Sequence, residues 1–384
     1  MAEDWQNGGF AAYVHWPFCA AKCPYCDFNS HVSRSIDQKR WLDAYVSEID
    51  RYAEEVGGRT LTSIFFGGGT PSLMDPDVVK AVIDRLRLHW PAVNNLEVTL
   101  EANPGSVESG RFRAYSEAGV NRISMGIQSL RDDDLRRLGR IHTVEEAKKA
   151  FDIARNQFER VSFDLIYARQ QQTPEEWRKE LAEALSMTID HLSLYQLTIE
   201  EGTAFGDRYK AGKLRDLPAE DSASEMYEIT QEICERFGMP AYEISNHAKA
   251  GAESQHNIVY WRYGDYLGIG PGAHGRLTLG GTRHATEGFR EPGRWLAAVG
   301  GGSGESVRDV LEAEDAASEF LLMGLRLRDG IDAGCFERIS GRPLNAERLG
   351  YLLEIGMVEC AGTTVRATDS GRMVLNAVIG ELLR

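Results

Sequence analysis

The chain of 384 residues has few basic residues, few cysteines and no long apolar run. Its 43 lysine and arginine residues are outnumbered by 58 aspartate and glutamate residues, which gives a formal net charge of -15. An acidic surface of this kind repels the phosphates of nucleic acids and anionic membranes, so we expect no nucleic acid as a partner. No apolar run reaches the roughly 20 residues that a membrane-spanning helix needs. We therefore do not expect an integral membrane protein.

The beginning of the sequence, MAEDWQNGGF, also lacks the basic and apolar segments of a secretory signal. We therefore expect a cytoplasmic protein. Disulfides are rare in that compartment, so clustered cysteines indicate metal or redox chemistry there. Three of the six cysteines, Cys234, Cys335 and Cys360, stand alone in the sequence. We interpret them as ordinary, partly buried thiols.

The other three cysteines, Cys19, Cys23 and Cys26, lie in the stretch YVHWPFCAAKCPYCDF with the spacing C-x3-C-x2-C. Three thiolates on one short loop can converge on a soft centre, which can be zinc, copper(I) or an iron-sulfur cluster. Structural zinc needs four ligands, and without a second cysteine pair the fourth would be a residue such as His15 or His31. Three cysteines on a four-iron cluster would leave one iron open to a substrate or cofactor.

Two common phosphate-binding motifs are absent from the glycine-rich stretch FGGGTPS at 66–72. It has neither the Lys-Ser/Thr of a P-loop nor the G-x-G-x-x-G frame of dinucleotide-binding folds. Its glycines would let the backbone approach a ligand closely. A tight connection between a strand and a helix explains the same glycines equally well.

Short apolar segments alternate with longer amphipathic segments through about the first 200 residues. This alternation predicts an α/β fold with a parallel sheet. Polar or glycine-rich motifs follow nearly every predicted strand, where a barrel gathers its site, and this favours a barrel over an open doubly wound sheet. The predicted strands are 11–16, 61–66, 96–101, 122–127, 161–167 and 192–198. The predicted helices include 41–55, 77–88, 144–158 and 174–186.

Several of these predicted strands end in polar side chains. Glu101 and Gln128 end neighbouring strands, and an acid beside an amide suits hydrogen bonds to ribose hydroxyls or an ammonium group. A solvated loop position is the alternative explanation for either residue. The sixth strand offers Tyr195, Gln196 and Thr198 at the same rim.

The stretch 246–275, which follows a predicted helix at 220–237 and a predicted strand at 241–245, is rich in histidines and aromatic residues among glycines. Haem iron takes His, Tyr, Cys or Met as axial ligands, and the macrocycle needs apolar cover. The stretch is therefore a candidate porphyrin site, with packing of a core against a loop as the alternative. No C-x-x-C-H motif is present, so we expect no covalent haem attachment of that kind. The relevant side chains are His247, His256, Tyr260, Trp261, Tyr263, Tyr266 and His274.

We divide the chain at two composition changes. Residues 1–218 form the predicted barrel, with 214–221 as its exit, and residues 219–310 form a connecting region that carries the candidate porphyrin site. Residues 311–384 read as helix, strand, turn, strand and helix, which predicts an α+β domain with a winged-helix-like pattern. Because the chain is acidic, we interpret that domain as a packing or partner surface.

The C-x3-C-x2-C motif after a short strand, with Tyr25 before its last cysteine, resembles the motif of the radical S-adenosylmethionine (SAM) family. The resemblance implies an incomplete (βα)6 barrel and a [4Fe-4S] cluster held by Cys19, Cys23 and Cys26, whose unique iron binds SAM. It also implies that a reduced cluster releases a 5'-deoxyadenosyl radical from SAM. A low-potential flavoprotein or ferredoxin would supply the electron. The implied SAM contacts are Tyr13, Tyr25, Gly68, Gly69, Thr70, Glu101, Gln128, Arg140 and Asp164.

Along its whole length the chain resembles the oxygen-independent coproporphyrinogen III oxidase-like branch of this family. The oxidases carry a fourth cysteine two residues after the third, where this chain has Phe28. The stretch HNIVYW at 256–261 is similar to the HNxxYW motif of the haem chaperones of this branch. The resemblance thus implies a chaperone that binds haem through His256, Tyr260 and Trp261 and delivers it to a target haemoprotein of the respiratory type. The alternative is the oxidase, in which the radical takes hydrogen from two propionate side chains.

Overall fold

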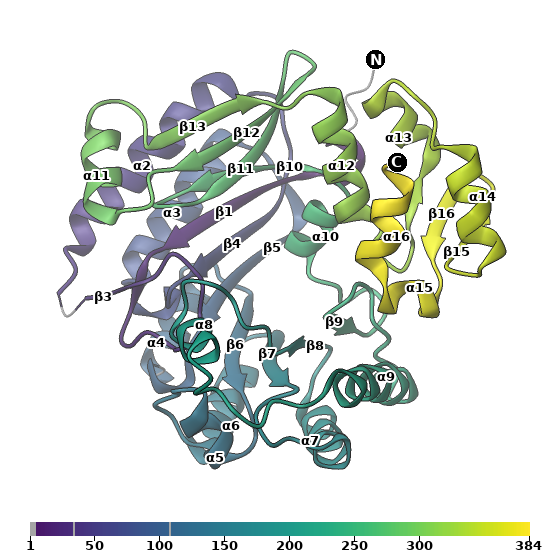
Figure 1. The fold of residues 1–384 in the computed structure, drawn as a ribbon. Coiled ribbons are helices and arrows are strands. Elements are labelled where there is room, and N and C mark those ends of the chain that lie inside the picture. Colours follow the sequence, from purple (N-terminus) through teal and green to yellow (C-terminus); the bar gives the residue numbers. More distant parts are fainter. Residues whose placement is uncertain (1–4, 34, 107–108) are drawn as a thin grey trace.

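The computed structural model describes residues 5–33, 35–106 and 109–384, and it is built around an 11-stranded sheet (Figure 1). The strand order is β13-β12-β11-β10-β1-β4-β5-β6-β7-β8-β9. All six predicted strands are present, lie side by side in chain order and pair in parallel. They are β1 (Phe10–Trp16), β4 (Leu61–Gly68), β5 (Ala92–Ala102), β6 (Arg122–Gln128), β7 (Arg160–Tyr167) and β8 (His191–Gln196).

Every connection between these parallel strands carries a helix, as parallel pairing requires. The four predicted helices are confirmed to within a few residues. This strand order is that of a (βα)6 unit, and the sheet stays open, with β13 and β9 at its two edges. The helices of this part are α2 (Gln38–Glu55), α3 (Pro76–His89), α4 (Ser109–Glu117), α5 (Asp132–Arg137), α6 (Val144–Arg155) and α7 (Pro174–Met187).

The main core lies between these helices and the sheet. Trp41, Tyr45 and Ile49 recur along α2 at helical spacing, and all three side chains are buried. They pack with apolar side chains of β1 and β4 in one continuous cluster. Burial of one apolar face per helix is what holds a βα unit on its sheet. In the described part of the chain, no helix is long and apolar enough to span a bilayer.

Four strands that the sequence pattern did not reveal extend the sheet beyond β1. β10 pairs in parallel with β1, and the next three strands follow in antiparallel order. Residues 265–310, which we expected to be a connection, thus belong to the main sheet. Their strands mix Gly, Arg, His and Thr and lack the apolar alternation that marks a strand in a sequence. They are β10 (Asp265–Ile269), β11 (His274–Leu279), β12 (Thr282–Gly288) and β13 (Glu305–Val310), with α11 (Pro292–Gly300) before β13.

The opposite edge of the sheet is formed after α8 (Ala204–Lys210) and α9 (Glu220–Arg236). The strand predicted at 241–245 is wrong, because only Ala241 forms an isolated bridge and the strand, β9 (Asn246–Ala248), begins later. The Glu243 carboxylate accepts hydrogen bonds from Ser245 N and Asn246 Nδ2, each 2.7 Å long. A local side-chain bond of this kind replaces a ladder bond and turns the backbone.

The C-terminal residues form a smaller unit with its own core, which packs beside the short helix α10 (Gln255–Trp261) (Figure 1). Helices surround a three-stranded antiparallel sheet of order β14-β16-β15, which agrees with the winged-helix-like pattern expected. The helices are α12 (Ala313–Gly324), α13 (Ala333–Ser340), α14 (Ala346–Glu354), α15 (Asp369–Met373) and α16 (Leu375–Leu382). The strands are β14 (Ile331–Asp332), β15 (Val358–Ala361) and β16 (Thr364–Ala367).

Candidate functional site

The cysteine-bearing loop leaves the sheet directly after β1. A two-residue strand, β2 (Phe18–Cys19), pairs in parallel with β3 (His31–Val32) and closes the base of the loop. Within it, Cys26 N donates a hydrogen bond of 3.2 Å to the Cys23 carbonyl oxygen, so the backbone turns between these two cysteines. The loop thereby brings the three thiols around one pocket.

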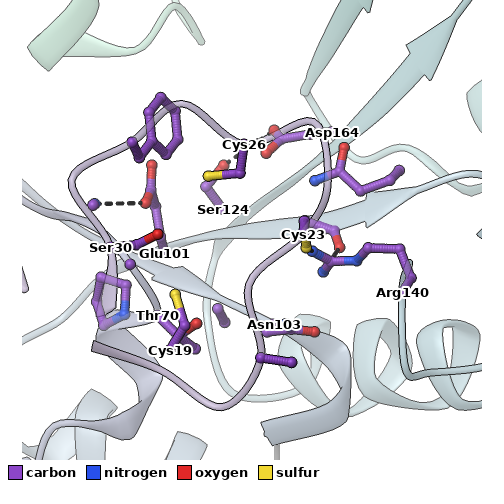
Figure 2. Close-up of a pocket in the computed structure, with 18 of the residues that line it drawn as sticks. Cys19, Cys23, Cys26, Ser30, Thr70, Glu101, Asn103, Ser124, Arg140 and Asp164 are labelled. Atoms are coloured by element: carbon purple, nitrogen blue, oxygen red, sulfur yellow. Dashed lines mark hydrogen bonds between the residues drawn. The ribbon is translucent and has the colours of Figure 1, made fainter. Parts of the chain in front are cut away.

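This cluster pocket lies over the carboxyl-terminal halves of β4 to β7 (Figure 2). It is lined by Cys19, Cys23 and Cys26 and by eight of the nine predicted SAM contacts. The ninth, Tyr13, lines a neighbouring pocket instead. The eight are Tyr25, Gly68, Gly69, Thr70, Glu101, Gln128, Arg140 and Asp164.

The glycine-rich stretch after β4 packs directly against the cysteine loop. Gly68 has φ +109°, and a Cβ there would lie 2.5 Å from Cε1 of His15. A Cβ on Gly69 would lie 2.6 Å from the Phe18 carbonyl oxygen. Both positions therefore require glycine for backbone packing. The glycines serve the tight connection and also line the pocket, so the two interpretations hold together.

Two carboxyl groups at the pocket wall have unusual proton affinities. Burial, followed by the negative charge of Asp164, raises the pKa of Glu101 to about 8. Burial also raises the pKa of Asp164 to about 6. Glu101 accepts a hydrogen bond of 3.2 Å from Gly68 N. A cation that enters this pocket would displace protons from these carboxyl groups, and SAM carries both an ammonium and a sulfonium charge.

Arg140, which follows α5, connects the barrel rim to the cysteine loop. Its Nη1 donates to Cys23 Sγ at 3.2 Å, and its Nη2 donates to the Gly126 carbonyl oxygen at 2.8 Å (Figure 2). Gln128 lies at the same rim with a left-handed φ of 73°, which turns the chain out of β6. The guanidinium thus places a permanent positive charge beside a prospective thiolate.

The three thiols fit a cluster better than a single metal ion. Among the described residues, no group of three or more His, Cys, Asp or Glu side chains is gathered closely enough to hold one ion. A four-iron cluster needs only one thiolate per iron, so thiols spread around a pocket suit it. Burial raises the pKa of the Cys19 and Cys26 thiols, so binding of iron would release protons.

The zinc alternative needs a histidine that this structure does not supply. His15 Nε2 lies 2.9 Å from the Asn29 carbonyl oxygen, and its Nδ1 lies 3.0 Å from the Tyr13 hydroxyl. His31 Nε2 lies 3.2 Å from Asn29 Oδ1. Neither imidazole lines the cluster pocket.

A second, larger pocket, which we call the aromatic pocket, adjoins the first. It has a volume of about 450 Å³ and opens to solvent, and Phe28, Gly68 and Glu101 line both pockets. Its walls come from the cysteine loop, from α10, from β10 and β11 and from α12. The other lining residues are Tyr13, His15, Asp27, Asn29, Tyr260, Trp261, Tyr266, Gly272, His274, Arg290 and Met323.

Two of the three predicted haem contacts line the aromatic pocket, and the third does not. Tyr260 and Trp261 line the aromatic pocket, whereas His256 lies behind them and is 2% exposed. His256 Nδ1 lies 3.1 Å from Ser63 Oγ, and its Nε2 lies 2.7 Å from the Tyr260 hydroxyl. Its ring also stacks on Phe65, with the centroids 4.8 Å apart. His256 therefore positions Tyr260 in this structure and does not reach the pocket.

Some other predicted residues do not join either pocket. Tyr195, Gln196 and Thr198, expected at the rim, are exposed and line neither of these two pockets. The isolated cysteines form no disulfide among the described residues, and Cys360 is exposed. Conversely, no sequence pattern indicated Ser30 in the cluster pocket or Arg290 and Met323 in the aromatic pocket. Sequence separation hides such residues, since only the fold brings them together.

Comparisons with known proteins agree with this geometry. The model described as Radical SAM superfamily matches residues 13–184, and the model described as HemN C-terminal domain matches residues 311–374. The heme chaperone HemW of Escherichia coli (strain K12) is 38% identical, with 96% of each chain covered. The chain belongs to the radical SAM superfamily. This membership implies a [4Fe-4S] cluster and SAM.

This radical SAM protein is also similar to a mitochondrial relative and to a solved structure. The mitochondrial radical S-adenosyl methionine domain-containing protein 1 of Mus musculus is 42% identical over 84% of this chain and 74% of its own. The solved structure titled coproporphyrinogen III oxidase (HemN) from Escherichia coli matches with a TM-score of 0.81 and 22% identity. It covers 98% of this chain and 92% of that one. At that identity the likeness establishes a shared fold.

Proposed function

We propose that this radical SAM protein is a haem chaperone, which binds haem in the aromatic pocket and delivers it to a target haemoprotein. Relatives named heme chaperone HemW in Escherichia coli and Bacillus subtilis are 38% and 35% identical over nearly the whole chain. The observation that carries the proposal is the aromatic pocket itself. Tyr260, Trp261 and Tyr266 offer the flat apolar cover that a porphyrin needs, in a pocket that opens to solvent.

The cluster pocket would serve SAM. Cys19, Cys23 and Cys26 would hold the [4Fe-4S] cluster, which supplies the electron for reductive cleavage of SAM when reduced. Glu101 and Asp164 would accept hydrogen bonds from the cationic cofactor, and Arg140 would pair with an anionic group. The Gly68 and Gly69 backbone lets the cofactor approach closely. A low-potential electron donor is a further proposed partner.

Phe28 favours the chaperone over the oxidase. It stands two residues after Cys26, where the oxidases of this branch carry their additional cysteine. Its side chain is 57% exposed and lines both pockets. An apolar ring at this place supplies cover for a macrocycle and no thiol chemistry. The oxidase remains the second candidate because its fold matches along the whole chain.

The experiment that tests this proposal combines three assays on the anaerobically reconstituted full chain. We expect stoichiometric haem binding by absorbance titration, transfer of that haem to an apo-haemoprotein, and no turnover of coproporphyrinogen III. Trp261→Ala should weaken haem binding by about tenfold, since an aromatic face is worth roughly 1–2 kcal/mol. The control, Tyr351→Ala, removes an exposed aromatic of α14 that lies outside the pocket and should change nothing. Turnover without haem binding would identify an oxidase instead.

A further inference from the structure

The aromatic pocket contains six side chains of the types that bind haem iron, and three of them, His15, Tyr13 and Tyr260, are already hydrogen-bonded. The six are two histidines, one methionine and three tyrosines. His15 is 4% exposed and is held through both ring nitrogens by Tyr13 and Asn29. Binding of iron by His15 would break one of these two buried hydrogen bonds, which is costly.

The tyrosines are poor ligands for a different reason. Haem iron binds tyrosine as the phenolate, and burial raises the pKa of the Tyr13, Tyr260 and Tyr266 hydroxyls well above the ordinary value. Tyr260 also shares its hydroxyl with His256 Nε2 at 2.7 Å. These rings therefore act as cover for a macrocycle.

His274 differs from His15 and from the tyrosines in its exposure to solvent and in its contacts. It is the first residue of β11, and its side chain is 58% exposed at the wall of the pocket. Its partner across the β-ladder is Glu287 of β12, and Nε2 of His274 lies 3.8 Å from Oε1 of Glu287. Metal-binding histidines commonly give their second N–H to a carboxylate, which fixes the ring and raises its basicity. At 3.8 Å the pair is longer than a hydrogen bond but already faces this arrangement, and Nδ1 of His274 has no hydrogen bond to the described residues.

We propose that His274 is the axial ligand of haem iron in the aromatic pocket, with Glu287 as the residue that orients its imidazole. The inference rests on the proposed function, because it names the iron ligand of that same pocket. It also separates two roles: His256 supports the wall through Tyr260, whereas His274 binds the metal. Arg290 also lines the pocket and is exposed, and its Nε lies 3.8 Å from the same Glu287 oxygen. Its guanidinium would pair with a haem propionate in exchange for this long contact.

An exposed ligand suits a protein that must release its cargo. Transfer then needs one ligand exchange, in which the bond between iron and the His274 nitrogen breaks as a bond between iron and a ligand of the acceptor forms. No electron moves, and neutral imidazole leaves with its lone pair. A ligand buried like His15 would instead require the pocket to open first.

The test is titration of the full chain with ferric haem and, in parallel, with metal-free protoporphyrin IX. His274→Ala should weaken haem binding by about tenfold or more and change the absorption and electron paramagnetic resonance spectra of the bound iron. Binding of metal-free protoporphyrin should be unchanged, because that molecule contacts the same walls and has no iron. Added imidazole should restore the wild-type spectrum by filling the space left by the side chain.

Two further variants sharpen the result. Glu287→Gln should weaken haem binding by less than His274→Ala and shift the spectrum slightly. His284→Ala removes a histidine of the same hairpin that does not line the pocket, so it should bind both porphyrins like the wild type. The proposal is overturned if His274→Ala keeps the wild-type spectrum, or if it loses metal-free protoporphyrin to the same extent as haem. If the wild type binds no haem at all, the proposed function fails with it.

Discussion

Glu101 links the chemistry of the cluster pocket to the stability of the folded chain. Its pKa is raised to about 8 in the folded state, so the native protein holds a proton that the unfolded chain, with an ordinary carboxyl, has already lost. Stability without SAM should therefore fall as the pH rises from about 4.5 to about 8, by at most about 1.4 kcal/mol per pH unit for this group. Asp164, with a pKa near 6, contributes in the same direction over the lower part of this range.

We expect Glu101→Gln to flatten that pH dependence, because the amide does not ionise. Urea unfolding at intervals between pH 5 and pH 8 measures the slope in each protein. Glu354→Gln, which changes an exposed carboxyl of α14, is the matched control and should keep the wild-type slope. Parallel curves for the wild type and Glu101→Gln would show that Glu101 is ionised in the folded protein.

The six cysteines should separate into two groups in an iron assay. Cys19→Ser, Cys23→Ser and Cys26→Ser should each abolish stable assembly of the cluster, since serine is a poor ligand for iron in such clusters. The wild type should hold about four irons and four acid-labile sulfides per chain after reconstitution. Cys360→Ser, which replaces an exposed thiol far along the sequence, should retain both. One zinc ion per chain and no sulfide would instead favour the zinc scaffold.

At the scale of single elements, α6 shows how a local pattern fixes a helix beside the site. Thr143 Oγ1 accepts a hydrogen bond of 3.2 Å from Glu146 N, and Glu146 Oε2 accepts one of 2.7 Å from Thr143 N. This capping box satisfies two backbone donors at the start of the helix. The sequence pattern predicts a helix over 144–158, and the helix begins at Val144 as expected.

Thr143→Ala should lower the free energy of unfolding by about 1 kcal/mol, because the first turn of α6 loses its cap. Denaturant unfolding provides the measurement. Thr143→Ser keeps the hydroxyl and should recover most of the loss. The iron content after reconstitution should stay at the wild-type value in both variants, and a large drop would mean that the start of α6 also shapes the cluster pocket.

The hairpin of β11 and β12 is an element that its own sequence does not predict. Gly268 of β10 lies so close to the hairpin that a Cβ there would be 2.2 Å from the His274 carbonyl oxygen. Glycine at this place lets the hairpin approach the end of β10 and brings His274 to the pocket. Such a close approach is a property of two segments together, so neither segment predicts it alone.

At the scale of the whole molecule, Asp265 joins segments that are far apart in the sequence. Its side chain is fully buried on β10 and forms ion pairs with Arg59, which precedes β4, and with Arg283 of β12, the latter at 2.9 Å. It also accepts a hydrogen bond of 3.0 Å from Thr278 Oγ1. One carboxylate thus pairs with two guanidinium groups and ties the added strands to the (βα)6 unit.

Removal of this carboxylate should be strongly destabilising. Asp265→Ala breaks two ion pairs of a fully buried carboxylate, and removal of one member of a buried pair typically costs about 3–5 kcal/mol. Thermal or urea unfolding of the full chain gives the value. Asp84→Ala removes the carboxylate of an exposed pair with Lys80 on α3 and should cost less than about 1 kcal/mol. Equal costs for the two variants would contradict the role of Asp265.

The sequence by itself determined the local parts of this protein. The cysteine spacing, the strand and helix periodicity and the polar ends of the strands are local patterns, and the structure places eight of nine predicted SAM contacts around the three thiols. These motifs lie together because parallel strands bring their carboxyl ends to one edge of the sheet. That the residues contact SAM stays a prediction.

Only the tertiary structure decided the aromatic pocket. His256 satisfied the motif, yet its ring turns inward to Ser63 and Tyr260, while His274 reaches the pocket from a strand without a recognisable pattern. Met323 arrives from a helix of the C-terminal unit. Which side of a residue faces a cavity depends on packing between distant segments, and no local spacing carries that information.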